Sequence, residues 1–181
     1  PEIELTLAVG NRQTVLDRVR AHAVDVAISG KPPDDARLVS EPLIDNEIAC
    51  ITAPDDPRAG TGPVLAGDLG DRVWLLREPG SGTRTLVEQF LNERGLVPAT
   101  LTLGSNGAIK QAARVGLGIS LLSRAAVETE LASGRLGELE LEDGPDRRSW
   151  FVLRSAVGPV RPPVEQFLAF LLATAGRNAR S

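Results

Sequence analysis

One segment of the chain, residues 103–123 with the sequence LGSNGAIKQAARVGLGISLLS, constrains the fold most strongly. Its apolar side chains recur at i, i+3, i+4 and i+7, which is typical of one buried helix face. Ser105 and Asn106 precede this face, and both residue types cap helix N-termini. Gly116 and Gly118 allow the left-handed backbone that ends a helix, and the apolar run 119–122 predicts a buried strand. A helix N-terminus held by a buried strand suits an anion site.

A second segment of the same kind is the motif Gly80-Ser81-Gly82-Thr83, between a predicted strand and a predicted helix. Two glycines let the backbone come close to a ligand, while Ser81, Thr83 and the first helical N–H groups offer donors to an anion. Arg84 follows and adds a positive charge, although a side chain on a first helical turn also commonly points to solvent. The alternative interpretation is a simple strand-to-helix turn capped by Ser81. Ser105 and Asn106 have the same two interpretations, cap or ligand donor.

The beginning of the chain predicts a strand over residues 3–9, a short helix, and a second strand over residues 24–29. A strand, helix and strand of these lengths form a βαβ unit with parallel strands. Ligands of such sheets bind beyond the carboxyl ends of the strands, which places Asn11, Ser29 and Gly30 at the mouth of a site. Asn11 has a plainer interpretation as the cap of the short helix.

Composition and spacing argue against several function classes. A net charge of −4 and a pI near 5.1 do not fit DNA binding by this chain alone, and no apolar run approaches the roughly 20 residues of a membrane span. His22 and Cys50 are the only residues of their kinds and stand in separate segments, so no activated nucleophile is indicated. The chain has no P-loop, no dinucleotide fingerprint and no metal-ligand spacing. We therefore expect that the chain is not an enzyme and that it binds no metal ion and no cofactor.

Three spaced motifs together resemble one known family. They are the opening PEIELTLAVGN…VLDRV…VDVAI over residues 1–28, the run REPGSGTR at residues 77–84, and residues 103–123. In this order they resemble the effector-binding domain of LysR-type transcriptional regulators, in the branch of carbon-fixation and cysteine-metabolism regulators. The resemblance extends to about Leu171.

The resemblance implies an α/β fold of the bilobal, periplasmic-binding-protein-like type 2 class. Two three-layer α/β subdomains joined by two crossover strands are expected, with residues 1–50 and 151–181 in subdomain I and residues 51–150 in subdomain II. The extended segments around Ile51 and Trp150 are expected to lie side by side. The family begins this domain with a strand and a helix that are absent here, so an unpaired edge is expected at residues 3–9.

The resemblance also implies a function. The domain would bind a small metabolite in the cleft between its lobes and so bias the conformation of a cytoplasmic regulator, a homodimer or homotetramer that contacts DNA through an upstream helix-turn-helix domain not in this chain. The lack of Tyr and the 3% aromatic content favour a polar or anionic ligand. The alternatives are a solute-binding protein of a transporter and a catalytic domain such as a dehydratase. The predicted ligand-binding residues are Asn11, Ser29, Gly30, Gly80, Ser81, Gly82, Thr83, Arg84, Ser105 and Asn106.

Overall fold

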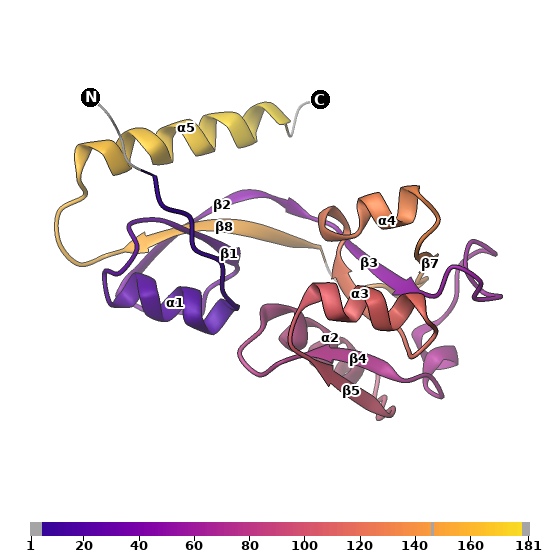
Figure 1. Ribbon diagram of the computed structural model, residues 1–181. Helices are drawn as coiled ribbons and strands as arrows, with labels where there is room; N and C mark the ends of the chain where they lie inside the picture. The colour runs from indigo at the N-terminus through magenta and orange to yellow at the C-terminus, as the bar shows by residue number, and fades with distance from the viewer. Residues whose placement is uncertain (1–4, 146, 179–181) are drawn as a thin grey trace. The chain divides into compact units, whose positions relative to one another are not determined.

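The computed structural model describes residues 5–145 and 147–178 (Figure 1). The chain divides into two compact units: unit 1 takes both ends of the chain, through residue 45 and from residue 148, and unit 2 takes residues 46–147. The strand β3 (Ile48–Thr52) contains the expected subdomain boundary between residues 50 and 51, and among the described strands it pairs with two strands of unit 2.

Unit 1 is built around a small sheet with the strand order β1-β8-β2. Strands β1 and β8 are antiparallel, with Ala27 opposite Leu153. Helix α1 packs its buried Leu16 and Val19 against these two residues and so forms the core of this unit. The elements of unit 1 are α1 (Arg12–Arg20), β1 (Ala27–Gly30), β2 (Leu38–Asn46), β8 (Arg148–Ser155) and α5 (Pro162–Asn178).

The strand predicted at residues 3–9 is not formed in the described part of that stretch. Residues 5–10 belong to no helix or strand, and Leu5, Leu7 and Val9 are 74%, 86% and 90% exposed (Ile3 lies outside the described residues). The expected βαβ unit is therefore wrong for unit 1, where β1 pairs antiparallel with β8. The physical reason is that alternating apolar residues form a strand only when a neighbouring strand accepts their backbone hydrogen bonds.

Ile51 and Trp150, whose segments were expected side by side, do not lie opposite each other, but one strand beside β8 is β2, which ends at Asn46 just before β3. Ile51 lies in β3 and is paired with Ser120 and Glu138, whereas Trp150 lies in β8 opposite Gly30. Each of the two segments therefore belongs to the sheet of its own unit.

Unit 2 contains two small sheets, β6-β3-β7 and β4-β5, connected by a parallel bridge between Trp74 and Ile119. Strands β4 and β5 are parallel and are connected through α2, so they form a βαβ unit. Besides β3, the elements of unit 2 are the 3₁₀ turn η1 (Ala66–Leu69), β4 (Trp74–Arg77), α2 (Gly82–Glu93), β5 (Thr100–Leu103), α3 (Asn106–Arg114), β6 (Ser120–Ser123), the 3₁₀ turn η2 (Arg124–Ala126), α4 (Glu128–Ala132) and β7 (Gly137–Leu139).

Helices α2 and α3 cover opposite faces of this strand layer. Successive strand residues point to opposite faces, and Trp74 and Leu76 of β4 pack with the α2 side chains Val87 and Phe90. Leu75, between them, packs instead with Ile109 and other residues of α3. Unit 2 therefore has the three-layer α/β/α arrangement, with a core on each side of its strands.

Gly118 has a role different from the predicted one. Gly116 has a φ of 77° and ends α3 in the left-handed conformation, as expected, but Gly118 has no positive φ. A Cβ on Gly118 would lie 2.4 Å from the carbonyl oxygen of Val73. This close approach lets Ile119 donate to Val73 O at 2.9 Å and accept from the amide of Leu75 at 2.8 Å. The absence of a side chain at Gly118 therefore allows the backbone hydrogen bonds that join the two sheets of unit 2.

We predict that Gly118→Ala lowers the free energy of unfolding by about 1–3 kcal/mol, because the methyl group must push two backbones apart. Gly107→Ala is the matched control, since its new Cβ would meet nothing nearer than Ser105 Oγ at 3.7 Å. Urea denaturation measures both. Equal stability of the two variants would show that the sheets do not depend on this contact.

Candidate functional site

The predicted residues of unit 2 are brought together by the parallel pair β4–β5. Arg77, the last residue of β4, is in register with Leu103, the last residue of β5. Both strands therefore end at one edge of the sheet, and α2 and α3 begin just beyond it. This is the edge at which ligands of parallel sheets bind.

Each of these helices begins with a serine cap. Ser81 is 4% exposed, and its Oγ accepts a hydrogen bond from the amide of Thr83 at 3.2 Å. Ser105 Oγ accepts from the amide of Ala108 at 3.1 Å, so the cap of α3 is Ser105 and not Asn106. Within the described residues no acceptor takes the amide N–H groups of Gly82, Arg84, Asn106 and Gly107. Free N–H groups in a first helical turn attract anions.

Arg77 links the two helix starts. Its Nε and Nη2 donate to the two carboxylate oxygens of Glu78 at 2.7 and 2.9 Å, and its Nη1 donates to Oδ1 of Asn106. The Arg77 side chain is only 14% exposed. Because Oδ1 of Asn106 is used in this way, the amide nitrogen of that side chain is the group left to donate elsewhere. Arg77 stands in the REPGSGTR motif, but its role could not be predicted from the sequence, because its partner Asn106 is 29 residues away.

Arg84 is held by protein groups and does not extend freely into solvent. Its Nε donates to Glu88 at 2.7 Å, and its Nη1 donates to the carbonyl of Arg77 at 3.0 Å and to Thr102 Oγ1 at 3.3 Å. These bonds tie α2 to the ends of both parallel strands. The neighbouring Gly80 is exposed and has a φ of 86°, a conformation that favours glycine.

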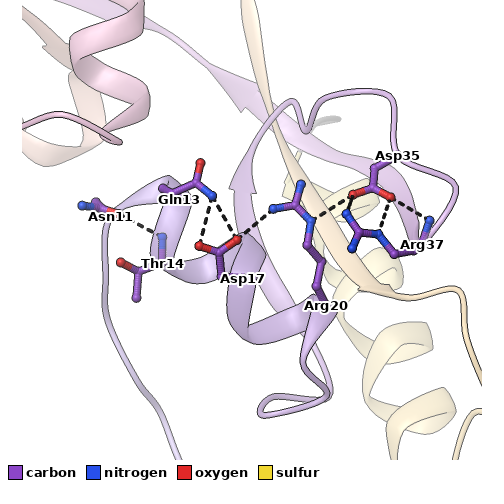
Figure 2. Close-up of polar contacts among 7 residues, drawn as sticks. All are labelled: Asn11, Gln13, Thr14, Asp17, Arg20, Asp35 and Arg37. Atoms are coloured by element: carbon purple, nitrogen blue, oxygen red, sulfur yellow. Dashed lines mark hydrogen bonds and ion pairs between the residues drawn. The ribbon is translucent and has the colours of Figure 1, made fainter.

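The predicted residues of unit 1 gather at the start of α1. Asn11 caps this helix, with its Oδ1 accepting from the amide of Thr14 at 3.0 Å (Figure 2). Ser29, which is buried, and Gly30 end β1. The side chain of Arg12, the residue after Asn11, donates through Nη2 to the carbonyl of Lys31, the residue after Gly30. Arg12 therefore joins the two predicted parts of this group.

A network of charged side chains fixes the rest of α1. Asp35 accepts hydrogen bonds from Arg37 and from Arg20, with Arg20 Nε at 2.9 Å (Figure 2). The hydrogen bonds from the Arg37 side chain and amide, together with the one from Arg20, hold the pKa of Asp35 far below its ordinary value. Asp17 accepts from Gln13 and Arg20 on the same helix. These residues anchor α1 to the loop before β2.

The titratable residues considered for catalysis lie apart from both groups. Cys50 is buried in β3, and this burial raises the pKa of its thiol to about 12, so the reactive thiolate is suppressed. His22 is exposed in the turn after α1 and lies 3.5 Å from Ser155 Oγ. Over residues 5–145 and 147–178, no cluster of three or more His, Cys, Asp or Glu could hold a metal ion. In the same part of the chain, no helix is long and apolar enough to cross a membrane.

We predict that Arg77→Gln lowers the free energy of unfolding by about 1–2 kcal/mol, because it removes charge-assisted hydrogen bonds at a mostly buried position. Arg135→Gln is the control, an exposed arginine of the same unit whose side chain makes one described hydrogen bond, from Nε to Ser133 Oγ. Urea denaturation compares the two. An Arg77→Gln protein as stable as Arg135→Gln would contradict the role of Arg77 as a link between the helix starts.

Comparison with known proteins identifies the family. The LysR substrate binding domain matches residues 1–176. The RuBisCO operon transcriptional regulator of Acidithiobacillus ferrooxidans is 34% identical over 184 residues, covering 100% of this chain and 60% of its own length. The transcriptional regulator CbbR of Rhodospirillum rubrum is 38% identical over 176 residues, covering 97% of this chain and 58% of its own length. The chain thus spans about 60% of the length of these relatives.

The chain is also similar in fold to solved structures of regulatory domains. The regulatory domain of CcmR from Synechocystis PCC6803, in complex with 2-PG, has a TM-score of 0.88 and 33% identity, with 95% of this chain and 83% of that chain covered. The effector binding domain of QuiR in complex with shikimate has a TM-score of 0.83 at 18% identity, covering 93% and 79%, which shows the fold alone. The predicted fold class, a periplasmic-binding-protein-like type 2 fold, is confirmed. The chain belongs to the LysR substrate-binding domain family, in the branch of carbon-fixation regulators.

Proposed function

We propose that this chain is the effector-sensing domain of a transcriptional regulator and that its effector is a small anionic metabolite. The observation that carries the proposal is the pair of helix N-termini at the ends of β4 and β5, where Arg77, the last residue of β4, donates to Asn106, the first residue of α3. Each N-terminus carries the equivalent of about half a positive charge. The free N–H groups of the two first turns and the Asn106 amide are donors without a described acceptor, which suits a phosphate or carboxylate group.

We propose the same ligand-binding role for all of the predicted residues, which form two groups. Gly80, Ser81, Gly82, Thr83, Arg84, Ser105 and Asn106 belong to unit 2, and Asn11, Ser29 and Gly30 belong to unit 1. Ser81, Ser105 and Asn11 are helix caps in the structure, and capping leaves the neighbouring N–H groups free for a ligand.

Binding, and not catalysis, is the role we propose for both groups. The relatives are transcriptional regulators, and the only cysteine is a buried thiol with a raised pKa. Effector binding would then shift the population of conformations of a longer, cytoplasmic, oligomeric regulator that contacts DNA through another domain. Because the similar regulatory domain of CcmR is in complex with 2-PG, that compound is the first to test.

The test is a thermal-shift panel of phosphorylated and carboxylated metabolites, including 2-PG and inorganic phosphate. We expect an effector at about a hundred times its dissociation constant to stabilise the wild-type chain by roughly 2.7 kcal/mol. Gly82→Asp should abolish the shift, because its carboxylate lies where the anion binds. The fold should tolerate this change, since an acidic residue in a first helical turn is favourable.

Gly67→Asp is the matched control. It adds the same charge and bulk to an exposed turn of unit 2, where a new Cβ meets nothing within 4 Å. A compound that stabilises wild type and Gly67→Asp but not Gly82→Asp supports the proposal. Equal stabilisation of all three proteins would place the site elsewhere, and a panel without any stabilising compound would overturn anion sensing.

A further inference from the structure

The fold brings together Arg77 and Asn106, which are 29 residues apart in the sequence. Arg77 ends β4 opposite Leu103, the last residue of β5, and Asn106 begins α3 shortly after that strand. The Arg77 side chain donates through Nη1 to Oδ1 of Asn106. Its other described hydrogen bonds run from Nε and Nη2 to the two carboxylate oxygens of Glu78, at 2.7 and 2.9 Å. One edge of the guanidinium is therefore fixed on Glu78, and the remaining nitrogen contacts Asn106.

This contact determines which end of the Asn106 amide faces Arg77. A guanidinium carries N–H donors and no acceptor, so the amide atom that it contacts must be the oxygen. The reverse orientation would set two donors against each other and would lose a charge-assisted hydrogen bond. The Asn106 side chain therefore keeps its NH₂ group on the side away from Arg77.

The NH₂ group of Asn106 has no acceptor among the described residues, and it is open to solvent. In the part of the chain that the structure describes, one buried side-chain nitrogen or oxygen lacks a partner, and that atom belongs to Arg12. Asn106 does not cap the helix either, because Ser105 Oγ accepts from the amide of Ala108 at 3.1 Å. No described contact of the helix or of the core uses the Asn106 NH₂ group.

We propose that Arg77 is a positioning residue of the effector site, which holds the Asn106 amide with its NH₂ group towards the anion. The inference rests on the proposed function and adds how the site selects its ligand. An amide that rotates freely also presents its oxygen, which repels an anion. Held in one orientation, Asn106 favours an ionised phosphate or carboxylate over a group that must donate a hydrogen bond. Because Glu78 pairs with the guanidinium, Arg77 acts through Asn106 and is not itself a ligand.

The experiment is a double-mutant cycle on the 181-residue chain, with dissociation constants of inorganic phosphate and malonate measured by calorimetry at fixed pH and ionic strength. Arg77→Met keeps the length of the side chain but cannot donate, and Asn106→Ala removes the amide. Each variant should weaken binding about threefold to tenfold, the loss expected for one hydrogen bond. The loss caused by Arg77→Met should be at least about threefold smaller in the Asn106→Ala background. The effect of leaving Glu78 without Arg77 is present in both backgrounds and cancels.

Asn106→Asp separates positioning from a purely structural contact with Arg77. The aspartate keeps an oxygen for Arg77 and adds an acidic residue to the first turn of α3, so this variant without anion should melt at the wild-type temperature or higher. It has no NH₂ group, so its binding of phosphate and malonate should fall more than about tenfold. Gln111→Glu is the control, because it adds the same charge at an exposed position of α3 and should change binding less than about twofold.

Two results would overturn the inference while leaving the proposed function intact. The first is an equal effect of Arg77→Met in the two backgrounds, because Arg77 would then act independently of Asn106. The second is anion binding by Asn106→Asp equal to that of Gln111→Glu, a comparison that does not depend on the folding of Arg77→Met. Failure of wild type to bind either anion would overturn both the inference and the proposed function.

Discussion

The parallel pairing of β4 with β5 is the constraint on which the rest of unit 2 depends. It ends two strands in register at Arg77 and Leu103, and so both following helices begin at one edge. The layer is completed by Ile119, whose backbone bonds to Val73 and Leu75 require that position 118 has no side chain. With α2 and α3 on opposite faces, the apolar cores fix the helix axes, and the capped N-termini are positioned by burial elsewhere in the unit.

The arginines near the helix starts stabilise the fold in two ways. Arg77 and Arg84 are held by several acceptors each, and they connect helices to strand ends. Arg20 and Arg37 fix α1 through a carboxylate whose pKa they lower. Hydrogen bonds to charged partners restrict the side chains of these arginines and so hold the helix starts in place. Arg12 differs, because its one acceptor among the described residues is the backbone carbonyl of Lys31.

Strong local patterns could be predicted from the sequence, and distant partnerships could not. The helical periodicity around Ile109 and the capping side chains Asn11, Ser81 and Ser105 were assigned as the structure has them. Strand β5 was not predicted, because its TLTL sequence is short and mostly exposed, and it is a strand only because β4 pairs with it. The strand expected at residues 3–9 failed for the converse reason: the pattern is present, but no described strand pairs with residues 5–9. Whether the site residues bind a ligand stays a prediction.

The most direct test of the account is an amide NMR titration of the chain with inorganic phosphate. If an anion binds where the two helices begin, the N–H groups without an acceptor should show the largest saturable shifts, namely Gly82, Arg84, Asn106 and Gly107. The amides of Leu131 and Ser133, which donate to the carbonyls of Val127 and Thr129, should be unaffected. Saturable shifts confined to other parts of the chain, with these four amides unmoved, would contradict the account.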